Sequence, residues 1–309
     1  MKKLLIFFIL FLGISCTPKT TNSSMKTDEL KSYYEKELTE LEWDSTDIDY
    51  IKSFLKPAIN ISFEKSKSIG LGKSKFGGTP DLPKDIEWAR FEGKPMIFLA
   101  QINLSELKEY DLNNELPKTG ILYFFIHFKE PENQFGAEYN FIFDKQEYSV
   151  LYSENENLEK TDFPSDLISL YHFNEVALNF SNIYTFPSYE TLEAESINEK
   201  DRENFYTFNE MHGNNEGEQI LGYTMPIQSD VTGDWAFSYL NLTSWDLSEQ
   251  DKKKIDNIRP KFVTLLQFSL ENDITGFNKI GISIGYFGIT KEDLKNKNFK
   301  NSILVLQDT

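Results

Sequence analysis

Two segments of the chain carry the polar residues whose types and spacing could hold a ligand. Each segment has a turn rich in Gly and Pro followed by a strand with a central Gln. Glycines let the backbone approach a bound molecule, because they lack a Cβ, and carboxylate and amide groups supply the few polar contacts of a ligand site. The five candidate ligand-binding residues are Asp81, Gln101, Gln228, Asp230 and Gln267.

A shared groove would need both turns and both Gln strands to converge, with Trp88 and Trp235 as its apolar walls. We favour the alternative, in which the Gly and Pro residues only shape loops. In that interpretation both Trp residues fill the core, which is the commoner fate of Trp.

The same two segments form an internal repeat. The first copy comprises residues 76–80, 99–104 and 120–126, and the second comprises residues 221–226, 265–270 and 281–289. We therefore expect residues 69–130 and 217–295 to fold as related sheet units with Gln101 and Gln267 at equivalent positions; the alternative is a coincidence between aromatic strands. In each strand the Gln shares a face with a small polar residue. We interpret that face as turned to solvent rather than to a shared cleft.

Catalytic and metal-binding constellations are largely missing from the sequence. The three histidines are His127, His172 and His212. They stand far apart and only one Cys accompanies them, so we expect no metal and no cofactor. The Gly-x-Ser-x-Gly pattern at 281–285 lacks the helix and the downstream His of a nucleophile elbow. Asp230 and Asp234 flank Gly233 in an expected turn, where a weak calcium site competes with ordinary turn chemistry.

Composition excludes some function classes. The 309 residues include 49 acidic and 32 basic ones, which gives a formal net charge of −17. Such a surface repels nucleic acid and anionic lipid headgroups, so we expect no nucleic-acid partner. Aromatic residues make up 15% of the chain, whereas disordered acidic chains are poor in them. The composition therefore predicts a folded domain with a substantial core.

The N-terminal residues predict a lipoprotein signal peptide over residues 1–15. Two lysines precede an apolar run at 4–12, which is too short for a membrane span of about 20 residues. Small residues then precede Cys16, as in the lipobox, whose Cys is lipidated after cleavage; Gly13 departs from that motif, in which Leu is usual. The alternative is a secretory signal with an incidental Cys. Residues 16–26 are polar and small and predict a flexible tether.

Residues 27–309 are expected to form one α+β domain. Apolar residues at helical spacing predict helices over 27–43 and 45–56, the second stopped by Pro57, and a short helix within 196–211. Strands rich in Phe, Ile and Tyr are predicted over residues 59–63, 96–104, 121–128, 139–143, 148–152, 176–180, 262–270 and 280–289. Because the helices are grouped, the pattern predicts a mostly antiparallel sheet built from two related halves, with N-terminal helices.

Several of these segments resemble the YwqG-like family, a bacterial domain of unknown function. The motifs are KFGGTPDLP at 75–83, FLAQINL at 98–104, GILYFF at 120–125, PIQSD at 226–230 and LLQ at 265–267. The resemblance covers roughly residues 60–305 and implies a fold but little function. Members occur near toxin–immunity genes, which permits an immunity-like role. The family usually has a Gly-Asp-x-Gly turn before its last aromatic strand, and the stretch at 280–283 has no acid.

Together these features predict a lipid-anchored protein of the bacterial cell envelope, facing the periplasm. Its anchor is the lipid at Cys16, and its domain is a non-catalytic module that binds a ligand or a protein partner. The first alternative is a carboxylate-based hydrolase that uses Asp81 or Asp230, and the second is a structural component of the envelope.

Overall fold

The fold is known from a computed structural model that describes most of the chain. The described residues are 27–40, 45–64, 68–128, 147–188, 197–199, 202, 205, 206, 208, 217–271, 273–280 and 284–308. The predicted signal peptide, Cys16, the predicted tether, the strand expected at 139–143 and His212 lie outside them. Within the described part, no helix combines the length and the apolar character that crossing a membrane requires.

A ten-stranded sheet organises the domain, in the order β14-β13-β12-β11-β1-β10-β2-β6-β7-β8. Its strands are β1 (Lys56–Glu64), β2 (Lys75–Phe76), β6 (Ile97–Asn103), β7 (Ile121–Ile126), β8 (Tyr148–Ser153), β10 (Val176–Thr185), β11 (Gln219–Leu221), β12 (Phe262–Ser269), β13 (Ile284–Thr290) and β14 (Ile303–Gln307). Every pairing in it is antiparallel. Two short ribbons, β3 (Asp81–Pro83) with β9 (Leu158–Lys160) and β4 (Arg90–Phe91) with β5 (Lys94–Pro95), complete the strands.

The sheet consists of two related halves, which confirms the predicted repeat. Strands β1 and β10 lie in the middle, with β2, β6, β7 and β8 on one side (the first half) and β11, β12, β13 and β14 on the other (the second half). Gln101 pairs with Tyr123 in the first half, and Gln267 pairs with Tyr286 in the second. The pairing register of each Gln strand shifts at the same place relative to the Gln. In β6 the shift lies between Phe98 and Ala100, and in β12 it lies between Thr264 and Leu266.

The turn before each Gln strand also has the same backbone shape in both halves. Gly77 and Gly78 have φ values of 63° and 68°, and their counterparts Leu221 and Gly222 have φ values of 63° and 69°. Such left-handed conformations are uncommon outside glycine. Their recurrence at matched positions shows that the two halves share one turn geometry.

The main core lies between the halves. The equivalent residues Phe124 and Phe287 contact each other there, with ring centroids 5.0 Å apart. Phe268 of β12 and Tyr148 of β8 also pack on the Phe287 ring. Equivalent residues of the two halves thus meet in the main core at the Phe124–Phe287 contact.

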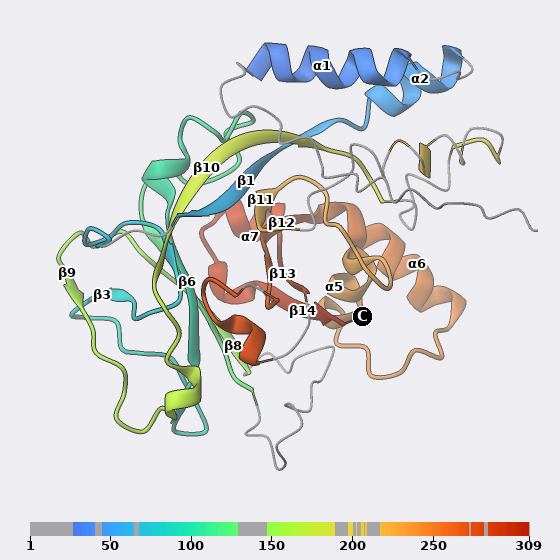
Figure 1. Cartoon of the computed structure of the whole chain (residues 1–309). Coiled ribbons are helices and arrows are strands. Elements are labelled where there is room, and N and C mark those ends of the chain that lie inside the picture. Colours follow the sequence, from blue (N-terminus) through green and yellow to red (C-terminus); the bar gives the residue numbers. More distant parts are fainter. Residues whose placement is uncertain are drawn as a thin grey trace, which may run out of the picture.

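The other face of each half is covered by different elements. In the first half Leu82 of β3, Leu158 of β9 and Trp88 pack on that face. In the second half helices α5 (Val231–Tyr239) and α6 (Glu249–Ile258) cover it, and Trp235 of α5 is buried in the core between helix and sheet. Figure 1 shows β3 and β9 at one side of the molecule and α5 and α6 at the other. Both Trp residues therefore pack in cores, as favoured from the sequence.

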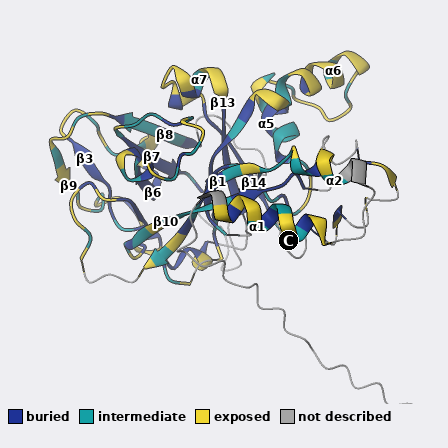
Figure 2. Cartoon of the chain, turned by 90° about the horizontal axis from the view of Figure 1, so that it is seen from above, coloured by how far each residue is buried: buried dark blue, intermediate teal, exposed yellow. Residues whose placement is uncertain are grey.

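Two N-terminal helices, α1 (Thr27–Thr39) and α2 (Ser45–Lys52), pack on the end of β10. They form a separate small core that joins Tyr34 and Ile51 to Tyr184 and Phe186. Figure 2 shows exposed residues along α1 and α6 and buried ones along the sheet. The expectation that Pro57 ends the second helix is wrong, because Pro57 is the second residue of β1. It lies beyond the stretch of β1 that pairs with β11, so its missing N–H breaks no ladder bond on that side.

Candidate functional site

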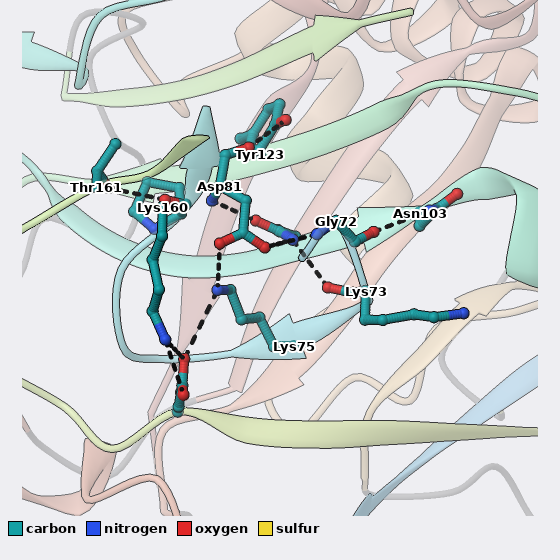
Figure 3. A network of polar contacts seen from close by, with 11 residues as sticks. Gly72, Lys73, Lys75, Asp81, Asn103, Tyr123, Lys160 and Thr161 are labelled. Carbon is teal, nitrogen blue, oxygen red and sulfur yellow. Dashed lines mark hydrogen bonds and ion pairs between the residues drawn. The ribbon is translucent and has the colours of Figure 1, made fainter. Parts of the chain in front are cut away.

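Asp81 is the centre of a buried polar network (Figure 3). Its Oδ1 accepts a hydrogen bond from Lys75 Nζ at 3.0 Å. Its Oδ2 accepts bonds from the backbone N–H of Gly72 at 2.8 Å and from Gln101 Nε2 at 2.9 Å. The Lys75 and Asp81 side chains are each only 2% exposed, so this ion pair is shielded from solvent and depends on the bonds around it.

Gln101 fastens the turn that carries Asp81. Its Oε1 accepts from the Asp81 backbone N–H at 2.8 Å, and its Nε2 also donates to Lys73 O at 2.8 Å. Gln101 is 0% exposed, so the expectation that it faces solvent is wrong. The turn and the loop before it fold over the amide and occupy its hydrogen-bonding groups. The amide of Gln101 is therefore used inside the protein.

Tyr123 closes the network from the neighbouring strand. Its hydroxyl donates to Asp81 O at 2.8 Å. Burial raises the pKa of Tyr123, and the Asp81 carboxylate raises it further. The phenol therefore stays protonated, and stays a donor, across the physiological range.

A chain of alternating charges leads from this network to the surface. Glu175 lies 3.7 Å from Lys75 Nζ and 3.2 Å from Lys160 Nζ. Thr161 Oγ1 donates to Pro80 O at 2.7 Å and ties β9 to the same turn. The buried lysine therefore has two carboxylates, one buried and one that is partly exposed.

The loop at residues 70–74 is held by side chains of this network and its neighbours. Asn103 Nδ2 donates to Gly72 O at 2.8 Å, and the Ser74 N–H donates to Glu106 Oε2 at 3.0 Å. Leu71 nevertheless stands exposed at the tip of this loop. The network thus fixes the backbone that directly follows this exposed apolar side chain.

In each half a Gln side chain and a Tyr hydroxyl bond to the backbone of one turn residue, and we call this arrangement the Gln clamp. The second half has the Gln clamp without the charged residues. Gln267 Oε1 accepts from the Met225 N–H at 2.9 Å, Gln267 Nε2 donates to Gly217 O at 2.8 Å, and Tyr286 OH donates to Met225 O at 2.7 Å. Like Gln101, Gln267 is 0% exposed and does not face solvent. Met225 takes the place of Asp81 and Gln219 the place of Lys75.

Gln228 and Asp230 lie where α5 begins. Asp230 caps the helix, with its Oδ1 accepting from the Thr232 N–H at 3.0 Å, and it forms an ion pair with Arg259. The expected turn at Asp230–Asp234 is therefore wrong, because Gly233 is helical. The physical reason is the cap: Asp satisfies a free N–H of the first helical turn.

Asp234 sits beside this cap in the first turn of α5. Burial and, to a smaller extent, the nearby Asp230 carboxylate together raise the pKa of Asp234 to about 6. Ser229 Oγ donates to Asp234 Oδ2 at 3.3 Å. Within the described ranges no group of three or more His, Cys, Asp or Glu side chains could hold a metal ion.

The structure brings the predicted site residues together as two sets. Asp81 and Gln101 are bonded to each other in the first half. Gln228 and Asp230 lie in one surface segment of the second half, and Gln267 holds Met225 nearby in the chain. These sets pack against the covered faces of different halves, with the main core between them. Because Asp81, Gln101 and Gln267 are buried and bonded within their own halves, their side chains are not open to a shared groove.

Several residues of these networks were missed from the sequence. They are Lys75, Tyr123, Glu175, Arg259, Tyr286 and Gln307. The repeat carried a signal for the two tyrosines, because each follows the Gly at the start of its aromatic strand. Arg259 and Gln307 had no such signal, since their partners become neighbours only when α5 folds onto the sheet.

Comparison with known proteins shows that one protein family matches the chain. A family described as a domain of unknown function (DUF1963) matches residues 74–307. No curated protein matches the chain. The matched region holds every strand of the ten-stranded sheet except β1, together with all five predicted site residues.

Proposed function

We propose a function for this chain as a member of the DUF1963 family, to which it belongs and whose description states no activity. It is a lipoprotein of the bacterial cell envelope, tethered to a membrane through Cys16 and facing the periplasm. Its domain, of the YwqG-like kind, binds a protein partner without catalysis, as an immunity-like protein does.

The tether is supported by the N-terminal sequence. An apolar run of nine residues and small residues ahead of Cys16 match the requirements of a signal peptide cleaved before a lipidated Cys. Two or more acyl chains anchor a protein stably, whereas one gives only marginal binding. The high acidic content leaves lipid, rather than surface charge, as the means of holding the chain at a membrane.

One observation carries the binding role: the buried polar side chains hold loops rather than a reacting molecule. Asp81 and Gln101 are bonded to each other and to the backbone of Gly72 and Lys73, which directly follow Leu71 in the loop. A loop fixed in this way loses little conformational entropy on binding, which favours recognition. In this proposal Asp81 and Gln101 are positioning residues, and the partner meets the loop they position.

A pull-down with the chain from Met25 onward tests the binding role. We expect a protein partner to be retained by the wild type and lost with Leu71→Asp, whose melting temperature should stay within a few degrees of wild type. Lys84→Asp, which places a new acid at another exposed position, is the matched control and should keep the partner. Equal recovery with Leu71→Asp would refute a role for this loop.

A carboxylate-based hydrolase is a second candidate, favoured by the pair at α5. Asp234, with its pKa raised to about 6, lies beside Asp230, which Arg259 pairs. Two carboxyls with different environments are the arrangement used for general acid and base roles. Turnover of ester, glycoside or phosphoester substrates between pH 5 and 7, abolished by Asp234→Asn, would support it. Absence of turnover with all three would remove it.

A further inference from the structure

Trp245 presents one face of its indole ring to solvent. It lies in the segment between α5 and α6 and is 57% exposed, the second most exposed large apolar residue among those described. Its other face stacks on Phe237, with ring centroids 3.9 Å apart and planes 12° from parallel. Tryptophan is rarely left so open in a globular protein, and fixed exposed aromatic surface often marks an interaction site.

The indole is held in place by the chain around it. Phe237 is a buried residue of α5 and belongs to the same hydrophobic core as Trp235. The Leu242 N–H donates to Phe237 O at 3.2 Å, and the Leu247 N–H donates to Trp245 O at 2.9 Å. Both leucines pack on the same core. Binding to the open face therefore needs no ordering of this ring.

The charged residues on the N-terminal side of Trp245 are all acidic back to residue 219, whereas Lys252, Lys253 and Lys254 follow it in α6. Residues 219–251 contain five acidic residues and no Lys, Arg or His. Glu249 and Asp251 form ion pairs with Lys252 and Lys254 of α6. The Asp246 carboxylate, next to Trp245, takes part in no ion pair within the part of the chain that the structure describes. An exposed acid that forms no ion pair with any described residue therefore follows Trp245 directly in the chain.

We propose that the open face of Trp245 receives an arginine side chain from a basic segment of a protein partner, with Asp246 pairing the same guanidinium. A guanidinium is planar, stacks on aromatic rings and forms two parallel bonds to a carboxylate. A sugar ring also stacks on tryptophan and can donate hydroxyl bonds to a carboxylate, but a neutral sugar lacks the charge attraction that a guanidinium has for the acid. The inference rests on the proposed function in taking the partner to be a protein, and it adds a surface separate from the Leu71 loop.

The test titrates an arginine-rich hexapeptide into the full chain held in detergent. A matched peptide with citrulline in place of arginine keeps the shape and removes the charge. We expect the arginine peptide to bind, to bind more weakly as salt is raised, and to lose about tenfold in affinity with Trp245→Ala. The citrulline peptide should bind at least tenfold more weakly.

Two further variants keep the result interpretable. Asp246→Asn leaves the stacked pair intact and should weaken the arginine peptide several-fold with an unchanged melting temperature. Tyr239→Ala removes a different exposed aromatic side chain, at the end of α5, and should leave the affinity for the arginine peptide unchanged. No binding, equal binding of the two peptides, or full affinity with Trp245→Ala overturns the inference. If a partner is still recovered by pull-down, the proposed function stands while this inference fails.

Discussion

The Lys75–Asp81 pair is a buried charged contact within the polar network of the first half. Taking two charges out of water is costly, and the attraction between them offsets that cost only when the remaining lone pairs and protons are bonded. Here the bonds from Gly72, Gln101 and Glu175 meet that condition. The pair as a whole therefore adds little to the free energy of unfolding. Removing one partner would lower that free energy by more, because the other charge would stay buried without its partner.

Asp81→Asn should lower the free energy of unfolding by about 3 kcal/mol, because it leaves Lys75 buried with only the partly exposed Glu175 opposite. Chemical denaturation of wild type and variant measures this. Glu159→Gln, which removes an exposed partner of Lys84 at the adjacent ribbon, is the control and should change stability by less than about 0.5 kcal/mol.

The second half offers a neutral version of the same site. Lys75→Gln combined with Asp81→Met copies the Gln219 and Met225 arrangement, so neither charge is left alone. We expect the double variant to be more stable than Asp81→Met or Lys75→Gln alone. Additive losses in a double-mutant cycle would contradict the matching of the two halves at this position.

Asp234 makes stability depend on pH. Its folded pKa of about 6 lies above the ordinary value of 3.8, so the folded state holds the proton more tightly between those values. The contribution of Asp234 to the free energy of unfolding therefore falls as pH rises from about 4 to 6, and stays low above 6. Asp230 and Arg259 are the charges that face it.

Asp234→Asn should thus stabilise the protein at pH 7 by about 1–2 kcal/mol and flatten its pH profile relative to wild type. Thermal unfolding of both proteins between pH 4 and 8 tests this. The exposed Asp246→Asn removes the same charge and should leave the profile unchanged. A variant less stable than wild type at pH 7 would show that the carboxylate is bonded well enough to favour its charged form.

At the scale of elements, the strands were easier to predict than the helices that cover them. Alternating aromatic residues and the internal repeat located β6, β7, β12 and β13. Helix α5 escaped prediction because it contains Gly233 and aromatic residues and is buried on several sides, which leaves no clear apolar stripe. The Gln clamps were placed on the correct strands, but solvent exposure was misjudged because loop contacts are not encoded in strand periodicity.

The turn after β11 should be intolerant of a side chain. A Cβ at Gly222 would lie 2.5 Å from Thr185 Oγ1 and 2.6 Å from Ala58 Cβ, and its φ of 69° disfavours other residues. We expect Gly222→Ala to cost about 2–4 kcal/mol. Gly233→Ala, in α5 with its nearest neighbour 3.9 Å away, should instead gain about 0.5–1 kcal/mol. Similar stabilities for the two variants by denaturation would contradict the turn geometry.

Strand β1 should be indispensable although it precedes the family match. It pairs with β10 along its whole length and with β11, so it joins the two halves of the sheet. A chain that begins at Ser74 should lose cooperative thermal unfolding. A chain that begins at Lys56 loses α1 and α2 and the small core beneath them, yet should still unfold cooperatively at a lower temperature. Cooperative unfolding of the shorter chain would contradict the role assigned to β1.

At the scale of the whole molecule, the two related halves of the sheet are covered by different elements and present different surfaces to solvent. The first half carries short ribbons and the Leu71 loop, and the second carries α5, α6 and Trp245. The equivalent Gln and Tyr residues fix the turns in both halves. The scaffold is thus shared, while the elements laid on it differ. Sequence periodicity predicted the scaffold, and tertiary contacts decided what covers it.

The central claim is that this domain is held at a membrane by lipid on Cys16, and labelled palmitate tests it most directly. Cells that express the full chain are grown with the label, and the purified protein is examined for incorporation. We predict that the wild type is labelled, that Cys16→Ser is not, and that globomycin causes unprocessed precursor to accumulate. A wild-type chain that takes up no label would contradict the account.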